Sequence, residues 1–264
     1  MLKVEDIYRR FGAELYDAST EGFKNEIEFY IEEAHRSGSP TLELGCGTGR
    51  ILIPIAEAGF EVVGLDSSSA MLDITRKALN DKPAEMRDRV TLVEADMQSF
   101  ALERQFSLII VPFRAFQHLL KSEEQRRSLQ CIREHLNADG RLVINLFDPR
   151  LDLLVAHSGN LGSALKKYRE FKHPVTGNRI IIWETRSINL TEQIIDEDWI
   201  FEELNSEGVP VSRRFTNFKI HYFFRWEMQY LLELCGFEVL ELYGDFKRGA
   251  FKHGREQIWV GVKK

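Results

Sequence analysis

The sequence predicts an α/β fold in which a doubly wound, mostly parallel sheet carries an inserted antiparallel β meander. Short apolar runs alternate with amphipathic helical segments five times within about the first 150 residues, as in parallel sheets covered by helices. A glycine-rich turn follows the first apolar run, where a ligand-binding crevice is expected. After Pro149 the rhythm changes to strand-like alternation broken by turn residues.

Composition narrows the class of protein. The chain has 264 residues, of which 44% are hydrophobic and 29% are charged, which suits one large globular domain with an insertion. A formal net charge of -6 makes nucleic acid a poor partner. The three cysteines are widely spaced and odd in number, which fits neither a zinc framework nor a disulfide scaffold. With no signal-peptide pattern and no bilayer-length apolar run, we expect a cytoplasmic protein without a membrane partner.

The first part of the chain is predicted to be helical over residues 5–36, because apolar residues recur at helical spacing until the breaker SGSP. Five strands are then expected at 41–44, 60–65, 90–94, 106–111 and 141–147, with helices at 50–58, 67–80 and 122–136. The run at 106–111 is uninterrupted and apolar, which is typical of a strand buried on both faces. Three serines, Ser67 to Ser69, are capping candidates for the helix that follows them.

The second part is predicted to begin with a helix over 151–168 and to continue as strands within 169–190, 191–204 and 212–224. A helix over 225–235 and two closing strands complete the chain. We therefore expect four parts: an N-terminal helical lid (1–40), a cofactor-binding core (41–150), an antiparallel insertion covering the substrate site (151–225), and a closing helix with strands (226–264).

The glycine turn lies in TLELGCGTGR, residues 41–50. Such a turn presents backbone N–H groups and a helix N-terminus at the carboxyl edge of the sheet, and glycine permits close approach of a ligand. The spacing Gly45, Gly47, Gly49 differs from the G-x-G-x-x-G fingerprint of dinucleotide binding. Glu43, just before the first glycine, would repel a pyrophosphate and attract an ammonium group.

Two more acidic residues end the next strands. Asp66 ends the second strand, where a ribose-binding carboxylate belongs. Asp96 ends the third and can accept from the exocyclic amine of adenine, while Met97 packs on the ring. Acidic residues at three strand edges favour adenosine with a positively charged tail, a description that S-adenosylmethionine fits.

The segments ELGCGTGR, GLDSS with MLDITRKAL, and EADMQSF resemble the successive motifs of class I S-adenosylmethionine-dependent methyltransferases of the small-molecule type, which carry an antiparallel insertion after strand five. The resemblance covers residues 41–147 and implies a Rossmann-like fold with S-adenosyl-L-methionine as cofactor. The cofactor-binding residues that it implies are Tyr16, Glu43, Gly45, Cys46, Gly47, Gly49, Asp66, Ser67, Met71, Asp96, Met97, Pro112 and Phe113.

The resemblance also places the segment after the fourth strand beside the methyl donor. His118 is then a candidate proton acceptor, and Arg114 a candidate for binding a substrate carboxylate. The alternatives are a histidine bonded to the backbone at a helix start and a solvated loop arginine. Tyr8 and Tyr16 are lid candidates that can equally serve packing.

The function predicted is methyl transfer by in-line displacement to a nitrogen or oxygen of a small molecule, with positioning as the main source of rate and no metal. A methyltransferase acting on protein or RNA is the first alternative, opposed by V-P-F-R where base-modifying enzymes carry N-P-P-Y. An NAD-dependent oxidoreductase and a non-catalytic cofactor-fold binding protein are the others. The acceptor, the choice of nitrogen or oxygen, and the oligomeric state (monomer or homodimer) stay open.

Overall fold

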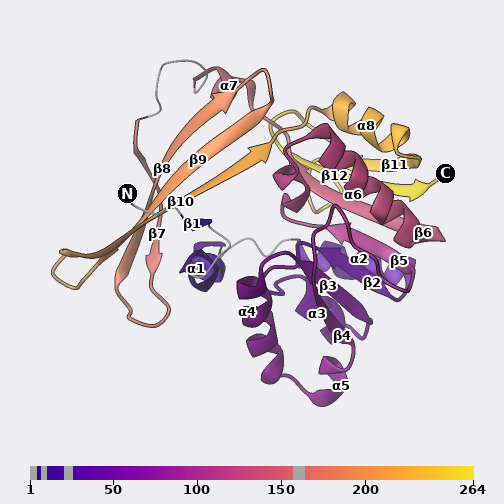
Figure 1. The fold of residues 1–264 in the computed structure, drawn as a ribbon, viewed down its shortest axis with the longest axis horizontal. Coiled ribbons are helices and arrows are strands. Elements are labelled where there is room, and N and C mark those ends of the chain that lie inside the picture. Colours follow the sequence, from indigo (N-terminus) through magenta and orange to yellow (C-terminus); the bar gives the residue numbers. More distant parts are fainter. Residues whose placement is uncertain (1–4, 7–10, 21–25, 157–163) are drawn as a thin grey trace. The chain divides into compact units, whose positions relative to one another are not determined.

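The computed structural model describes residues 5–6, 11–20, 26–156 and 164–264, and the chain divides into two compact units (Figure 1). Unit 1 comprises Met1–Phe23 and Leu151–His221, and unit 2 comprises Lys24–Arg150 and Tyr222–Lys264. None of the helices in the described ranges is both long enough and apolar enough to cross a membrane.

Unit 2 contains a seven-stranded sheet in the order β11-β12-β6-β5-β2-β3-β4. Its strands are β2 (Thr41–Leu44), β3 (Val62–Asp66), β4 (Val90–Glu94), β5 (Phe106–Val111), β6 (Leu136–Phe147), β11 (Phe237–Tyr243) and β12 (Glu256–Lys263). The five strands from β6 to β4 are parallel, and β12 pairs antiparallel with both β6 and β11. The predicted doubly wound, mostly parallel sheet is therefore confirmed.

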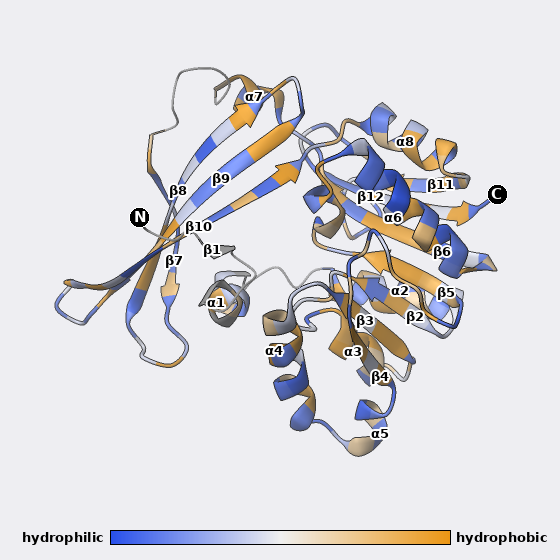
Figure 2. Ribbon diagram, viewed as in Figure 1, coloured by the Kyte–Doolittle hydropathy of each residue, from blue (hydrophilic) through white to orange (hydrophobic). Residues whose placement is uncertain are grey.

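Helices cover both faces of this sheet because its central strands are apolar on both sides (Figure 2). One face packs against α6 (Ser122–His135) and α8 (Arg225–Leu234), and the other against α2 (Ile27–Ser37), α3 (Leu52–Glu57), α4 (Ser69–Asn80) and α5 (Ala84–Arg87). Strand order reverses at β2, which has β5 on one side and β3 on the other. In open α/β sheets the ligand crevice lies at the carboxyl ends of the strands at such a point.

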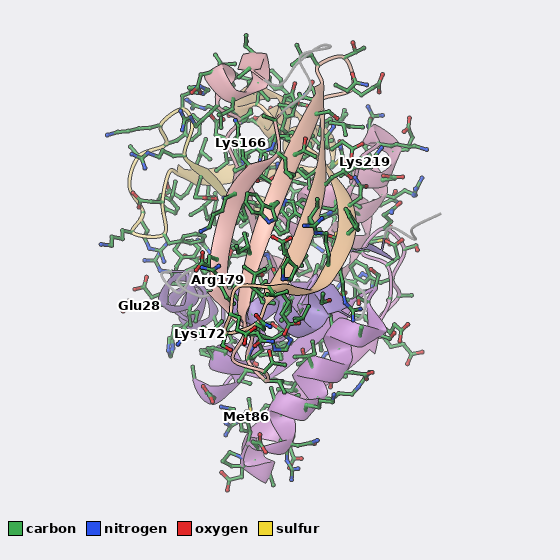
Figure 3. The ribbon with its side chains drawn as sticks, turned by 90° about the vertical axis from the view of Figure 1, so that its left-hand side faces the viewer. Glu28, Met86, Lys166, Lys172, Arg179 and Lys219 are labelled. Carbon is green, nitrogen blue, oxygen red and sulfur yellow. The ribbon has the colours of Figure 1, made fainter. Side chains whose placement is uncertain are left out.

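Unit 1 contains a five-stranded sheet in the order β1-β10-β9-β8-β7. Its strands are β1 (Glu5–Asp6), β7 (Lys166–Lys172), β8 (Arg179–Asn189), β9 (Ile194–Leu204) and β10 (Pro210–His221); in Figure 3, Lys166 and Lys172 mark the two ends of β7. Strands β7 to β10 form the predicted antiparallel meander, and β1 adds in parallel to β10. Leu15 of α1 (Phe11–Thr20) is buried against Ile180, Ile182 and Phe201 of this sheet.

The prediction of one helix over 151–168 is wrong. The structure has α7 (Leu151–Ala156) and then β7 from Lys166. β7 reads KKYREFK, a charged sequence whose strand conformation depends on pairing with β8, where Phe171 lies opposite Ile180. That pairing is not visible in local helical spacing.

The N-terminal segment also differs from the predicted single helical part. Residues 5–6 form a strand, followed by α1 and then, after a break, by α2. Segment 1–40 divides between the two units, because Leu15 packs in unit 1 whereas Phe29 packs in unit 2. The expectation that residues 151–225 cover the substrate site stays a prediction.

Candidate cofactor site at the carboxyl edge of the parallel sheet

The first glycine of the turn is required for two independent reasons. Gly45 has φ +71°, a conformation that L side chains rarely adopt. A Cβ added there would lie 2.8 Å from the Cβ of Ala115 and 3.6 Å from Cε of Met97. The Gly45 and Cys46 N–H groups both donate to the Leu65 carbonyl, at 2.7 and 3.1 Å. The turn is thus bound to β3 and in close contact with the segment after β5.

The other two glycines differ in their surroundings. Gly49 has φ +81°, and a Cβ there would meet Cγ2 of Thr75 at 2.8 Å. Gly47 has φ +54°, and nothing lies within 4 Å of an added Cβ. Gly49 therefore serves packing, whereas Gly47 leaves open space where a ligand can approach the backbone.

Asp66 holds the turn and the next helix together. Its Oδ2 accepts from the Gly47 N–H and its Oδ1 from the Ser68 N–H, both at 2.8 Å. The Thr75 hydroxyl donates to the Gly47 carbonyl at 2.7 Å, which fixes the turn from α4.

The N-cap of α4 is Ser68, whose hydroxyl accepts from the Met71 N–H at 3.3 Å. Of the three serines considered from the sequence, it is therefore Ser68 that caps the helix. Ser67 is exposed beside Asp66, and the Met71 side chain is buried.

Asp96 and Met97 follow β4. Asp96 is exposed, and its Oδ1 accepts from the Gln98 N–H at 2.8 Å, which fixes the turn. Met97 packs on the hydrophobic core and reaches toward Gly45. Both predicted adenine residues therefore lie at the edge that carries the glycine turn.

Glu43 is buried at the centre of the site, with 2% of its surface exposed. Its Oε2 has no hydrogen-bond partner among the described residues. Burial raises the pKa of this carboxyl well above its ordinary value; the nearby Arg50 opposes that shift, and Glu26 adds to it. The protein therefore holds a buried carboxyl oxygen here that has no partner among the described residues and that a bound ligand can satisfy.

Two neighbours from α2 and its start were missed by the sequence reasoning. Tyr30 is fully buried, its hydroxyl has no partner among the described residues, and burial beside Glu26 and Glu43 raises its pKa. Glu26, 3% exposed, forms an ion pair with Arg50. Local pattern does not distinguish Glu26 from the exposed Glu28 two positions later, because tertiary packing decides which is buried.

The segment after β5 has an unusual backbone. Phe113 and Arg114 have φ of 47° and 68°, and non-glycine residues in this region carry strain that concentrates at functional sites. The Arg114 guanidinium is 3.1 Å from Oε1 of Glu256, and the Asn145 amide donates to Oε2 of Glu256 at 3.0 Å. Arg114 thus binds a carboxylate of the protein itself, and this contact anchors the strained segment.

The remaining predicted residues are located as follows. Pro112 begins the strained segment, Arg50 stacks on the Phe113 ring at 4.6 Å, and His118 ends the short 3-10 helix η1 (Ala115–His118). Cys46 is buried, and burial raises the pKa of its thiol, which agrees with a packing role. Tyr16 lies on α1 of unit 1, so its contact with a cofactor stays a prediction. Tyr8 lies outside the described residues.

The comparisons with known proteins agree with this geometry. A family model described as "Methyltransferase domain" matches residues 41–140. A dTDP-3-amino-3,4,6-trideoxy-alpha-D-glucopyranose N,N-dimethyltransferase of Streptomyces venezuelae is 32% identical over 120 residues, covering 46% of this chain and 47% of that protein. The chain thus aligns with about half the length of this curated relative.

Two solved structures share the fold over nearly the whole chain. The CcbJ methyltransferase from Streptomyces caelestis has a TM-score of 0.79 at 23% identity, covering 99% of each chain. The S-adenosylmethionine-bound CalS10, an amino pentose methyltransferase from Micromonospora echinaspora, has a TM-score of 0.69 at 19% identity, covering 99% of this chain and 100% of that one. Residues 41–140 thus match a methyltransferase domain, and the chain as a whole shares the fold of these two methyltransferases.

Proposed function

We propose that this protein transfers the methyl group of S-adenosylmethionine to an amino nitrogen of a small amino sugar or a related amine. The observation that carries the proposal is the buried, unpartnered Oε2 of Glu43 beside the open backbone at Gly47. The ammonium group of a ligand would pair with the Glu43 carboxyl, and the rest of that ligand could lie against the backbone at Gly47. The amino-sugar acceptor is supported by the names of the Streptomyces venezuelae and Micromonospora echinaspora relatives.

The residues fit the cofactor in three parts. Glu43 holds the ammonium end, and the backbone of the glycine turn holds the rest of the methionine moiety. Asp66, at the end of β3, accepts from the ribose hydroxyls. Asp96 and Met97 bind the adenine, with Ser67 and Met71 supporting that end.

When bound, S-adenosylmethionine supplies a methyl group on a positively charged sulfur. The chain's own task is to bring an uncharged acceptor nitrogen in line with that methyl group and to keep water away, which is mainly positioning. Pro112 and Phe113 form the wall of the site after β5. One imidazole nitrogen of His118 accepts the proton that the acceptor releases.

The test is a methyl-transfer assay followed by mass spectrometry, with S-adenosylmethionine and a dTDP-linked 3-amino sugar as substrates. We expect one or two added methyl groups, and none on the matched sugar with a hydroxyl in place of the amine. His118→Gln should slow transfer by about 10² to 10⁴-fold with little change in S-adenosylhomocysteine affinity. The matched control is His173→Gln, in the β7–β8 turn of unit 1. Methylation of the hydroxyl sugar, or full activity in His118→Gln, would contradict these assignments.

We also propose a cytoplasmic location. It is supported by the cysteines Cys46, Cys131 and Cys235, all of which are free thiols. Cell fractionation with an antibody to the chain tests it, and recovery outside the cytoplasmic fraction would oppose it.

A further inference from the structure

One face of the sheet in unit 1 carries two neighbouring rows that contain buried polar side chains. Register pairs on β8, β9 and β10 place Glu184, Trp199 and Thr216 side by side in one row. The next row is Arg186, Glu197 and Phe218. On one side the next row contains Ile182, Phe201 and Arg214, and on the other side it contains Ile188, Ile195 and Ile220. Buried polar groups on an apolar face are costly unless they have partners.

Arg186, the positively charged side chain of these rows on β8, pairs more closely with Glu197 than with Glu184. Arg186 lies 2.7 Å from Oε1 of Glu197, and the Trp199 indole N–H donates to Oε2 of Glu197 at 3.0 Å. Burial raises the pKa of the Glu197 carboxyl, and Arg186 opposes that shift. Both oxygens of Glu197 are thus satisfied within the protein.

The second carboxylate, Glu184, has one oxygen without a hydrogen bond, although Lys166 of β7 lies opposite it in register. Oε2 of Glu184 is 3.8 Å from Arg186, which is too long for a hydrogen bond, and it has no hydrogen-bond partner among the described residues. The Thr216 hydroxyl, on a side chain of a residue only 3% exposed, also has none in that part of the chain. These two groups flank Trp199 in the same row.

An aromatic surface adjoins the two unsatisfied groups. The rings of Trp199 and Tyr168 have centroids 5.1 Å apart at 31°, and Phe218 meets Trp199 edge-on at 5.0 Å. Tyr168 is 46% exposed. An aromatic surface beside a carboxylate and a hydroxyl suits a ligand with an apolar face and hydrogen-bond donors at its edge.

We infer that the row formed by Glu184, Trp199 and Thr216 binds the hydroxyl or ammonium groups of a small polyol. Glu184 takes a donor from the ligand, because an ionised carboxylate only accepts. Thr216 exchanges a second hydrogen bond, and Trp199 packs on the carbon skeleton. That this ligand is the methyl acceptor rests on the proposed function; that the row binds such a ligand rests on unit 1 alone.

Calorimetric titration of the full chain with D-glucosamine and D-glucose, without S-adenosylmethionine, tests the inference. We expect saturable binding of at least D-glucosamine, reduced by about tenfold or more in Glu184→Gln. Stronger binding of D-glucosamine than of D-glucose assigns the contact at Glu184 to ammonium, and equal binding assigns it to hydroxyl. Asp198→Asn is the matched control, because Asp198 lies on β9 next to Trp199 and its side chain is on the opposite face of the sheet.

Thr216→Val provides a second test, because a hydroxyl that only stabilised the fold would not give the combination of effects expected for a ligand-binding hydroxyl. Removing a buried hydroxyl without a partner should raise the melting temperature of the free protein and weaken binding of the same sugar. The inference is overturned if neither sugar binds, if Glu184→Gln binds as well as the wild type, or if Thr216→Val lowers the melting temperature. Because methylation is assayed separately, a sugar that binds without being methylated supports this site and counts only against its identity as the acceptor.

Discussion

Glu43 is the residue at which stability and function oppose each other. Its pKa in the folded protein is raised well above the ordinary value of 4.5, so the native state keeps a proton that the unfolded chain releases. The stability contribution of a group with a raised pKa falls as pH rises from the unfolded value toward the folded value. Glu43 therefore destabilises the free protein near neutral pH, and the ammonium group proposed to bind there would remove that penalty.

We expect Glu43→Gln to be more stable than the wild type by about 1–3 kcal/mol at about pH 8, with the difference shrinking toward about pH 5. The same variant should bind S-adenosylhomocysteine at least tenfold more weakly. Thermal melts at both pH values and calorimetric titration measure the two effects. Glu28→Gln, on the exposed side of α2, is the control, and a pH-independent difference in stability would refute the argument.

Asp66 offers a second test at this scale, because both of its oxygens accept backbone N–H groups. Asparagine retains one acceptor and turns an NH2 group toward the other N–H. We expect Asp66→Asn to lose about 1–3 kcal/mol of stability and at least tenfold in S-adenosylhomocysteine affinity. Urea unfolding and titration measure these quantities. Asp73→Asn, an exposed change on α4, should alter neither, and an unchanged affinity in Asp66→Asn would remove the ribose assignment.

Among the elements, the segment after β5 combines strain with an external anchor. Phe113 and Arg114 have positive φ, and Arg114 is held by Glu256 of β12. Because His118 follows in the same segment, the anchor positions the proposed proton acceptor.

We expect Glu256→Gln to change stability by less than about 1 kcal/mol, since the pair is partly exposed. The turnover of methyl transfer should fall severalfold to tenfold while S-adenosylhomocysteine affinity stays close to the wild-type value. Steady-state kinetics and titration separate the two. Glu61→Gln, which breaks the surface pair with Arg104, serves as the control, and equal turnover in both variants would exclude a positioning role.

The parallel strands could be predicted from sequence because their signal is local. β2, β4 and β5 have the predicted bounds, since short apolar runs between turn residues have few alternatives. β7 could not be predicted, because its charged sequence becomes a strand only through pairing with β8. In the same way, the spacing of residues along the chain predicts the glycine turn and Asp66. Glu26 and Tyr30 could not be predicted, because only the packing of α2 brings them to the site.

At the scale of the whole molecule, local sequence patterns do not predict that the chain divides into these two units. Unit 1 joins an N-terminal segment to an insertion more than a hundred residues later. The contacts that define it, such as Leu15 against Ile182 and Phe201, are long-range. The sequence indicated an insertion because the strand rhythm changes after Pro149, but not that α1 belongs with it.

This division leads to a prediction about which unit a bound cofactor stabilises against unfolding. The predicted cofactor residues from Glu43 to Met97 all belong to unit 2. A ligand that binds only the folded state stabilises it by about 2.7 kcal/mol at one hundred times its dissociation constant. We therefore expect scanning calorimetry to show two transitions, of which S-adenosylhomocysteine raises only the one that belongs to unit 2.

Core variants assign the transitions, since Leu15→Ala and Ile55→Ala each remove a fully buried side chain, from unit 1 and unit 2 respectively. Each should lower its own transition by the equivalent of about 2–5 kcal/mol. If S-adenosylhomocysteine raises the temperature of both transitions, the expectation that the unfolding of unit 1 does not depend on this ligand is wrong. Tyr16 is then the first residue to test. Tyr16→Phe should then uncouple the two transitions if its hydroxyl reaches the cofactor, and should leave them coupled if the units are linked by packing.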